Sequence, residues 1–306
     1  MEKDKVVAIV CVRMSSERLP GKPLVSYHPG GKPNLECIVE RVQTSRYNPK
    51  IVIATSTDKS DDTIAKWAED KDVSLYRGSL ENVVKRFDGA LQKYCPEAGF
   101  IWRVMGDCPL VDIGLTDLRL DILDRSGADV ITISPPEPTY AAQSSVWSRD
   151  AWNYCAKMSS GSLLPHPGEY IYENLGQFKT LHELGPESVY YQDIRTELDT
   201  EKDLEFFRQV WKGCDDHFWS SGNRGDAYNE FLHVLDTKSV LTWLSSQPHL
   251  TAINRDVPLK TKSTHLHGHS HARRFVCKNC SAVIGHRIND KLSLQCPSCG
   301  ETRDYY

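Results

Sequence analysis

The fold class of this chain can be read from residues 6–22, Val6-Val-Ala-Ile-Val-Cys-Val12 followed by Arg13-Met-Ser-Ser-Glu-Arg-Leu-Pro-Gly-Lys22. The first seven residues are all apolar, which is typical of a parallel strand buried on both faces. The next ten contain three cations, two serines and a Pro-Gly pair, and they predict a tight basic loop. Because α/β folds bind ligands in loops that leave the carboxyl ends of parallel strands, we expect a binding site here.

The charge of this loop suggests the kind of ligand. Arg13, Arg18 and Lys22 together can hold a group with several negative charges, such as a triphosphate. The alternative is an exposed surface loop with a chance cluster of basic residues.

Strand-like and helix-like segments alternate after the loop. Further strands are predicted at residues 50–55, 73–76, 99–105 and 129–133. Helices are predicted at residues 34–45, 61–69, 80–94 and 116–126. This alternation predicts an α/β fold, a Rossmann-like, mostly parallel sheet covered by helices on both faces.

The second half of the chain is less regular. Residues 135–168 are rich in Pro, Ser and Gly, and we expect them to form a lid or dimerisation insert. Strand-like segments resume at residues 170–174 and 193–200. Helices follow at residues 201–211 and 237–247, with a loop-like stretch from residue 214 to 228 between them. The main domain is thus predicted to cover residues 1–258.

Length and composition limit the class of protein. The chain has 306 residues, 40% apolar and 25% charged, and a net charge of −4, so no overall basic field points to nucleic acid. We expect no membrane span and no signal peptide. The 10 cysteines fit a cytoplasmic protein in which four bind metal and six stay reduced.

The C-terminal segment has the cysteine spacing of a zinc site. Cys277 and Cys280 form one Cys-x-x-Cys pair, and Cys296 and Cys299 form another. Four thiolates at this spacing complete a tetrahedral structural Zn²⁺ site, so residues 275–306 are predicted to be a zinc ribbon. Few aromatic residues accompany its basic residues, so we expect a protein partner rather than nucleic acid if it binds anything.

A histidine-rich stretch, residues 259–274, connects the ribbon to the main domain. Its histidines at 265, 267, 269 and 271 alternate. They would share one face of an extended chain and could bind a metal ion there. A flexible linker is the preferred interpretation, and an expression tag is another.

Two aspartates supplement the basic loop. Asp107 follows the strand-like run 99–105, and Asp199 follows the run 193–198. Carboxylates at the carboxyl edge of the sheet can hold Mg²⁺ on phosphate oxygens. For Asp199 the alternative is a helix N-cap, because Thr-Glu-Lys follows it.

With these motifs in place, residues 5–260 resemble the cytidylyltransferases of the spore coat polysaccharide biosynthesis protein F group. This group is related to the CMP-KDO and CMP-acylneuraminate synthetases. The motifs that carry the resemblance are Arg13-x-x-Ser16-x-Arg18-Leu-Pro-Gly-Lys22, Tyr76-Arg-Gly-Ser79 with Arg86-Phe87, Arg103-Val-Met-Gly-Asp-Cys-Pro-Leu110, His166 with Tyr170-Ile-Tyr-Glu-Asn174, and Asp199-Thr-Glu-Lys-Asp-Leu-Glu205.

The resemblance implies a homodimeric, CTP-dependent enzyme. It would form a CMP conjugate of an acidic sugar, phosphonate or similar small acidic metabolite and release pyrophosphate. The implied catalytic residues are Arg13, Lys22 and Asp107, and Mg²⁺ would lie on Asp107 and Asp199. The implied nucleotide-binding residues are Arg13, Ser16, Arg18, Lys22, Ser79, Arg86 and Asp107.

Two departures from the family pattern are the ribbon and Glu17, which places a negative charge in the basic loop. Glu17 and His166 are candidates for contact with the acceptor. Two other functions stay open at this point. One is a sugar-1-phosphate nucleotidyltransferase that uses another nucleotide, and the other is a non-catalytic nucleotide- or nucleic-acid-binding protein that acts through the ribbon.

Overall fold

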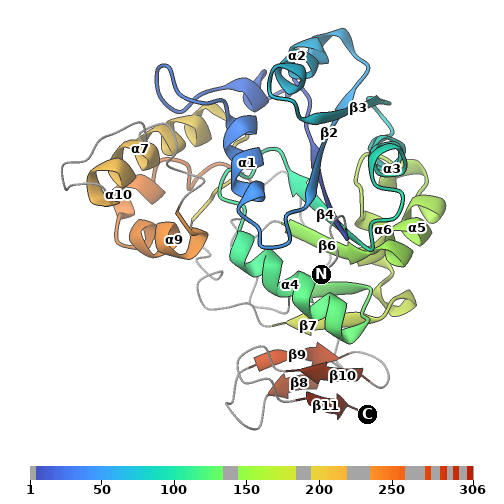
Figure 1. Cartoon of the computed structure of the whole chain (residues 1–306). Helices are drawn as coiled ribbons and strands as arrows, with labels where there is room; N and C mark the ends of the chain where they lie inside the picture. Colours follow the sequence, from blue (N-terminus) through green and yellow to red (C-terminus); the bar gives the residue numbers. More distant parts are fainter. Residues whose placement is uncertain are drawn as a thin grey trace.

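A mixed sheet of nine strands forms the centre of the protein (Figure 1). The computed structural model describes residues 5–133, 144–183, 194–218 and 235–258, together with four strands between residues 273 and 305. The strand order is β3-β2-β1-β4-β6-β5-β7-β9-β8. The strands are β1 (Val6–Cys11), β2 (Lys50–Ser56), β3 (Ser74–Gly78), β4 (Phe100–Met105), β5 (Val130–Ile133), β6 (Ser144–Ser148), β7 (Thr180–Glu183), β8 (Arg273–Val276) and β9 (Val283–Arg287).

The sheet is parallel in its first half and mixed in its second. β1 pairs in parallel with β2 and β4, and β2 pairs in parallel with β3. β6 runs antiparallel between β4 and β5, and β5 pairs in parallel with β7. Part of the predicted lid or dimerisation insert at residues 135–168 therefore needs correction, because β6 is a central strand of the sheet and a regular helix follows it.

Helices cover both faces of the sheet, as predicted (Figure 1). In the main part they are α1 (Asn34–Gln43), α2 (Asp62–Asp70), α3 (Val83–Tyr94), α4 (Ile113–Ser126), α5 (Arg149–Met158) and α6 (Glu169–Glu173). The side chain of Asp112 caps α4 by accepting from the N–H of Leu115, and Gly127 ends that helix at a φ of +61°.

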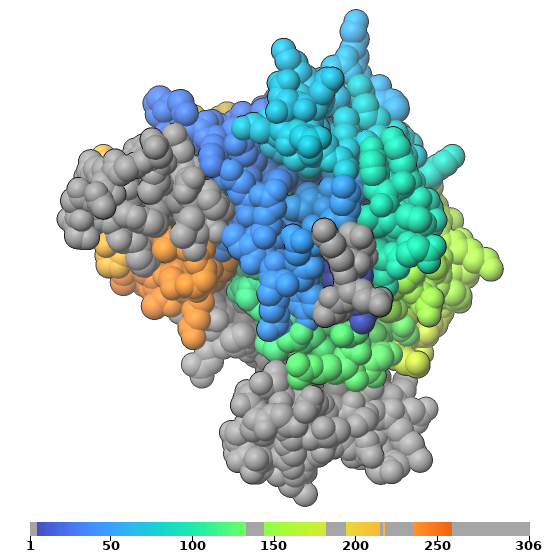
Figure 2. Space-filling model, in the orientation of Figure 1, coloured from blue at the N-terminus to red at the C-terminus, as the bar shows by residue number. Residues whose placement is uncertain are grey.

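Successive side chains of β1 point to opposite faces of the sheet, and each face has its own apolar core layer. Val6, Ala8 and Val10 pack with α1, α2 and α4, whereas Val7 and Ile9 pack with α3, α5 and α6. All five side chains are buried, which explains why β1 is apolar at every position. On the surface of the first face, α1 and α4 adjoin each other (Figure 2).

A third apolar cluster lies beside the sheet, where α7 (Glu201–Phe218), α9 (Thr237–Ser245) and α10 (Pro248–Thr251) come together (Figure 1). It also contains Leu19 and Tyr27, which follow β1, and Leu110, which follows β4. The ring of Tyr27 stacks on Trp211 of α7 with centroids 5.9 Å apart. This cluster holds the C-terminal helices against the edge of the sheet where the predicted site lies.

Three further predictions about the second half need correction. Residues 169–173 form the short helix α6 rather than a strand, and the strand lies later, at β7. Residues 194–199 have no regular secondary structure and belong to no strand. α7 continues to Phe218, so the start of the predicted loop 214–228 is helical.

The C-terminal segment contributes four short strands. β9 pairs antiparallel with β7 and β8, while β10 (Leu292–Gln295) and β11 (Thr302–Tyr305) form a separate pair. The four predicted zinc ligands and residues 259–272 of the histidine-rich linker lie outside the described residues. The six cysteines within the described residues form no disulfide. Among the described helices, none has the length and hydropathy of a membrane span.

Candidate active site

The basic loop lies where the sheet reverses its strand order. From β1 the chain moves outward through β2 and β3, and then returns to β4 on the other side of β1. In α/β sheets, ligands bind at such a reversal, outside the carboxyl ends of the strands. The loop after β1 and Asp107 after β4 flank this point, as the sequence predicted.

Four predicted residues meet there in one ion-pair network. The ammonium of Lys22 donates to Oδ2 of Asp107 and to Oδ1 of Asp199, at 2.7 Å in each case. The guanidinium of Arg18 donates to the other oxygen of Asp199, Oδ2, at 2.6 Å. The side chains of Lys22 and Asp199 are only 14% and 12% exposed, so water screens their attraction poorly.

The pKa values of the network reflect this pairing. Burial acts to lower the pKa of Lys22, but the charges of Asp107 and Asp199 outweigh burial and raise it. Burial acts to raise the pKa of Asp199, but the cations Lys22, Arg18 and Arg195 lower it. Both groups are therefore held in their charged forms.

The loop itself is held by a buried carboxylate. Oδ1 of Asp61, which is fully buried, accepts from the N–H of Met14 at 2.7 Å, and Oδ2 accepts from the N–H of Ser56 at the end of β2 at 3.0 Å. Gly21 has a φ of +78°, a left-handed conformation that favours glycine, and its N–H donates to the carbonyl of Met14. The hydroxyl of Ser16 accepts from Leu19 N–H at 3.4 Å, so Ser16 shapes the loop.

A second buried carboxylate positions Asp199. Oδ2 of Asp203 accepts from the backbone N–H groups of Asp199 and Thr200, at 3.0 and 2.8 Å. Its Oδ1 accepts from Arg195 Nε at 2.8 Å and from Asn254 Nδ2 at 2.9 Å. From the sequence, no role was assigned to the side chains of Asp203, Arg195 and Asn254. A signal was present, because Asp203 lies inside the motif that begins at Asp199.

The alternative reading of Asp199 as a helix cap is excluded by these contacts. Thr200 and Asp203 form the reciprocal cap of α7, because each side chain accepts from the backbone N–H of the other. The carboxylate of Asp199 instead faces Lys22 and Arg18. The N–H of Leu198 also donates to the carbonyl of Asp107 at 2.7 Å, which ties the two carboxylate-bearing segments together.

The other predicted nucleotide-binding residues lie around α3. The Nη1 of Arg86 donates to the carbonyl of Ser79 at 2.8 Å, and the Arg86 side chain is buried. Its Nε is buried without a hydrogen-bond partner among the described residues. Burial lowers the pKa of Arg86, and the nearby positive charge of Arg13 also lowers it. Arg13 is exposed, and its side chain forms no hydrogen bond or ion pair with any described residue.

The two candidates for acceptor contact do not join the network. Glu17 is exposed, and within the described ranges its carboxylate has no hydrogen bond or ion pair. His166 is also exposed, in the turn between residues 163 and 169. This turn contacts the start of α3, because the N–H of Val84 donates to Leu164 at 3.0 Å.

The donor set is suited to a divalent cation. Asp107 and Asp199 direct one oxygen each at a single cation, which here is the ammonium of Lys22. Within the described part of the chain, no group of three or more His, Cys, Asp or Glu side chains could hold a metal ion. A Mg²⁺ ion on these two carboxylates would thus take its remaining oxygen ligands from phosphates and water, which is its usual preference.

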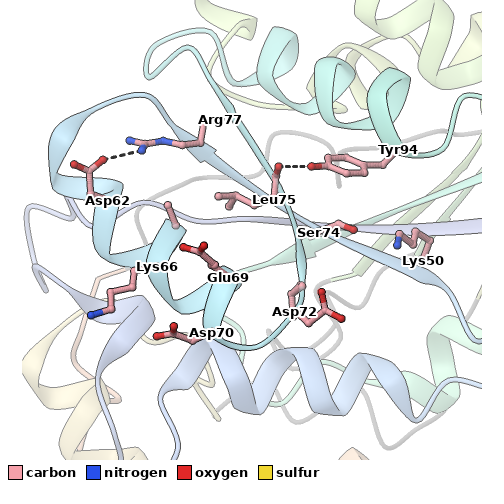
Figure 3. Close-up of a pocket in the computed structure, with 12 residues that line it drawn as sticks. Lys50, Asp62, Lys66, Glu69, Asp70, Asp72, Ser74, Leu75, Arg77 and Tyr94 are labelled. Carbon is pink, nitrogen blue, oxygen red and sulfur yellow. Dashed lines mark hydrogen bonds and ion pairs between the residues drawn. The ribbon is translucent and has the colours of Figure 1, made fainter.

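A hollow of about 860 Å³ lies away from this network, beside the edge strand β3 and α2 (Figure 3). No predicted site residue lines it. Within it, Arg77 pairs with Asp62 at 2.7 Å, and the hydroxyl of Tyr94 donates to the carbonyl of Leu75 at 2.6 Å (Figure 3).

Comparison with known proteins gives a family and a fold. The model of the cytidylyltransferase family matches residues 7–210. An uncharacterized protein of Methanocaldococcus jannaschii is 28% identical over 258 residues, 84% of this chain and 97% of its own length. The spore coat polysaccharide biosynthesis protein SpsF of Bacillus subtilis is 26% identical, with 68% of this chain and 86% of its own covered. The structure of a cytidylyltransferase from Leptospira borgpetersenii superposes with a TM-score of 0.67 at 23% identity, covering 84% of this chain and 99% of its own.

Proposed function

The chain belongs to the cytidylyltransferase family and is a nucleotidyltransferase, and we propose that it transfers the cytidylyl group of CTP to a small acidic acceptor with release of pyrophosphate. The observation that carries this proposal is the meeting of Arg18, Lys22, Asp107 and Asp199 at the reversal of strand order. Cations for phosphates and carboxylates for a divalent metal are the two components that such a transfer needs.

Each side chain has a place in this proposal. Arg18 and Lys22 bind the β- and γ-phosphates, and the exposed Arg13 is available to the same anion. Asp107 and Asp199 hold Mg²⁺, which when bound supplies positive charge to the phosphate oxygens. Ser79 and Arg86, on the α3 side, contact the nucleoside, and Ser16 holds the loop in shape.

The reaction exchanges one P–O bond for another. An acceptor oxygen forms a bond to the α-phosphorus, and the bond from that phosphorus to the bridging oxygen of the β-phosphate breaks. Negative charge builds on the bridging oxygen, where Lys22 and Arg18 neutralise it. The remaining contribution of the chain is to hold both reactants in line.

We infer an ionised acceptor because none of the three groups at the centre of the network can act as a general base. Lys22 is held protonated, and Asp107 and Asp199 are engaged by cations, so none of the three is available to take a proton from an alcohol. An acceptor that is already ionised, such as a carboxylate, a phosphate or a phosphonate, needs no such base. An acidic sugar that attacks through an ionised carboxylate or phosphate oxygen is also in keeping with the role in polysaccharide biosynthesis that the name of SpsF states.

The test is acceptor-dependent release of pyrophosphate from CTP, screened over acidic sugars, phosphonates and neutral sugars. We expect release with an acidic acceptor, and a loss of at least about a hundredfold in Lys22→Ala and Asp107→Ala. The matched control is Lys71→Ala, because Lys71 forms a similar ion pair, with Glu36 at 2.8 Å, outside the site. Unchanged release in both site variants, or equal release with UTP, GTP or ATP in place of CTP, would refute the assignment.

A further inference from the structure

Lys22 occupies the position that the two metal-binding carboxylates share. Its ammonium lies 2.7 Å from Asp107 Oδ2 and 2.7 Å from Asp199 Oδ1. A divalent cation that binds both of these oxygens needs the same place. The ammonium and the metal are therefore alternative occupants of one position.

The charges of the network make this exchange unfavourable for a metal ion by itself. Two carboxylates, Asp107 and Asp199, are matched by two cations, Lys22 and Arg18. Arg195 lies 3.6 Å from Asp199, but it is already paired with Asp203 at 2.8 Å. A metal ion that displaced Lys22 would place a doubly charged ion beside a largely buried ammonium that had lost both of its described carboxylate partners.

A nucleoside triphosphate removes this obstacle. Its phosphates offer new acceptors for the ammonium of Lys22 and the guanidinium of Arg18. Once the two cations contact the phosphates, Asp107 and Asp199 are free to bind a metal. The metal in turn binds phosphate oxygens, so the triphosphate and the metal assist each other.

For Lys22, rotation of the side chain on an anchored backbone accounts for its part in the exchange. Lys22 begins a short 3-10 turn, η1 (Lys22–Leu24), and its N–H donates to the carbonyl of Leu19 at 3.3 Å. The next residue, Pro23, is buried, which anchors the backbone. The flexible stem of a lysine then carries its ammonium between two sets of acceptors.

From this geometry we propose that Lys22 is the resident cation of the metal site and yields its place only to a metal that arrives with a nucleoside triphosphate. This inference rests on the proposed function, because it takes Asp107 and Asp199 as the metal ligands. It makes Lys22 a residue that sets the order of binding, in addition to its role toward the phosphates. Linkage requires the effect to be reciprocal, so the nucleotide must bind more tightly with the metal.

The test measures the binding of Mn²⁺ alone, by the loss of its free electron paramagnetic resonance signal. The full chain is compared with Lys22→Met, which keeps the length of the side chain and removes its charge. We expect Lys22→Met to bind Mn²⁺ at least about tenfold more tightly than the parent. The added Asp199→Asn change abolishes this gain, and the matched control Lys71→Met leaves Mn²⁺ binding unchanged.

Two results would overturn the proposal. One is equal binding of Mn²⁺ alone by the parent and Lys22→Met, with thermal melts showing that both are folded. The other is binding of α,β-methylene-CTP that is no tighter with Mn²⁺ than without it in the parent protein. Because the first comparison uses no nucleotide and no acceptor, its failure is distinct from failure of the pyrophosphate assay.

Discussion

Asp203→Asn is expected to lower the stability of the fold strongly. The side chain of Asp203 is fully buried and accepts from Asp199 N–H, Thr200 N–H, Thr200 Oγ1, Arg195 Nε and Asn254 Nδ2 at 2.8 to 3.0 Å, and from Arg195 Nη2 at 3.3 Å. An asparagine has one oxygen and one NH₂ group in place of the two oxygens. Whichever way the amide turns, its NH₂ group faces at least two buried donors.

The magnitude follows from the count of donors left without an acceptor. Each buried donor without a partner costs about 1–3 kcal/mol, and removing one partner of a buried ion pair costs about 3–5 kcal/mol in all. We therefore expect the free energy of unfolding to fall by about 4 kcal/mol. For a domain of this size, that lowers the Tm by roughly 8–16 °C.

Urea unfolding followed by circular dichroism measures this loss. An unchanged m value, the slope of the free energy of unfolding against urea concentration, shows that both proteins expose the same surface on unfolding. The matched control is Glu205→Gln, a carboxylate two residues along the same helix that is 48% exposed. We expect the control to change stability by no more than about 0.5 kcal/mol. A loss below about 1 kcal/mol in Asp203→Asn would refute the reasoning, because it would mean that the six hydrogen bonds to this carboxylate contribute almost nothing.

The remaining predictions concern the basic loop and its pH dependence. Asp61→Asn is expected to lower the free energy of unfolding by about 2 kcal/mol, because the backbone N–H groups of Met14 and Ser56 lose a buried carboxylate acceptor. Chemical denaturation measures this loss, and an unchanged free energy of unfolding would contradict the prediction. Gly21→Ala is expected to cost about 1 kcal/mol, because alanine is strained at a φ of +78°; a melt within 1 °C of the parent would argue against it. The pKa of Asp199 is lowered in the folded protein, so its stabilising effect is complete above its ordinary value of 3.8 and is lost as the pH falls through the lowered pKa. The pKa of Lys22 is raised, so its effect is complete below its ordinary value of 10.5 and is lost as the pH rises through the raised pKa. The stability difference between the parent and Asp199→Asn should thus be constant from about pH 5 to 9 and shrink below about pH 4. A large change of this difference near pH 7 would mean that the ion-pair network is not what causes it.

The first half of the fold could be predicted because its signals are local. β1 is buried on both faces and apolar throughout, and α3 has a helical apolar period with a capping asparagine, Asn82. β6 was missed because its sequence, Ser-Ser-Val-Trp-Ser, has only two apolar residues and lies in a stretch rich in turn formers. Its place in the sheet depends on pairing with β4, and this pairing cannot be predicted from the residues of β6 alone.

The members of the ion-pair network were candidates from the sequence, but their arrangement was not predicted. Lys22, Asp107 and Asp199 were identified, but the position of Lys22 between the two carboxylates depends on contacts across 85 and 177 residues. Arg195 and Asn254 were missed because their role is to hold other side chains, and a buried polar residue looks like a surface residue in sequence. The homodimer, the zinc ribbon and the acceptor roles of Glu17 and His166 stay predictions.

Both the third apolar cluster and the ion-pair network join the start of the chain to residues that are synthesised much later. Arg18 and its partner Asp199 are separated by 181 residues, which a ribosome adds in roughly 10 to 40 s. During that interval Leu19, Tyr27 and Leu110 have no α7 or α9 side chains to cover them. A nascent chain that ends before residue 194 lacks Asp199 and all of α7 and α9, so the ion-pair network of Arg18, Lys22, Asp107 and Asp199 can form only after residue 199 has been added.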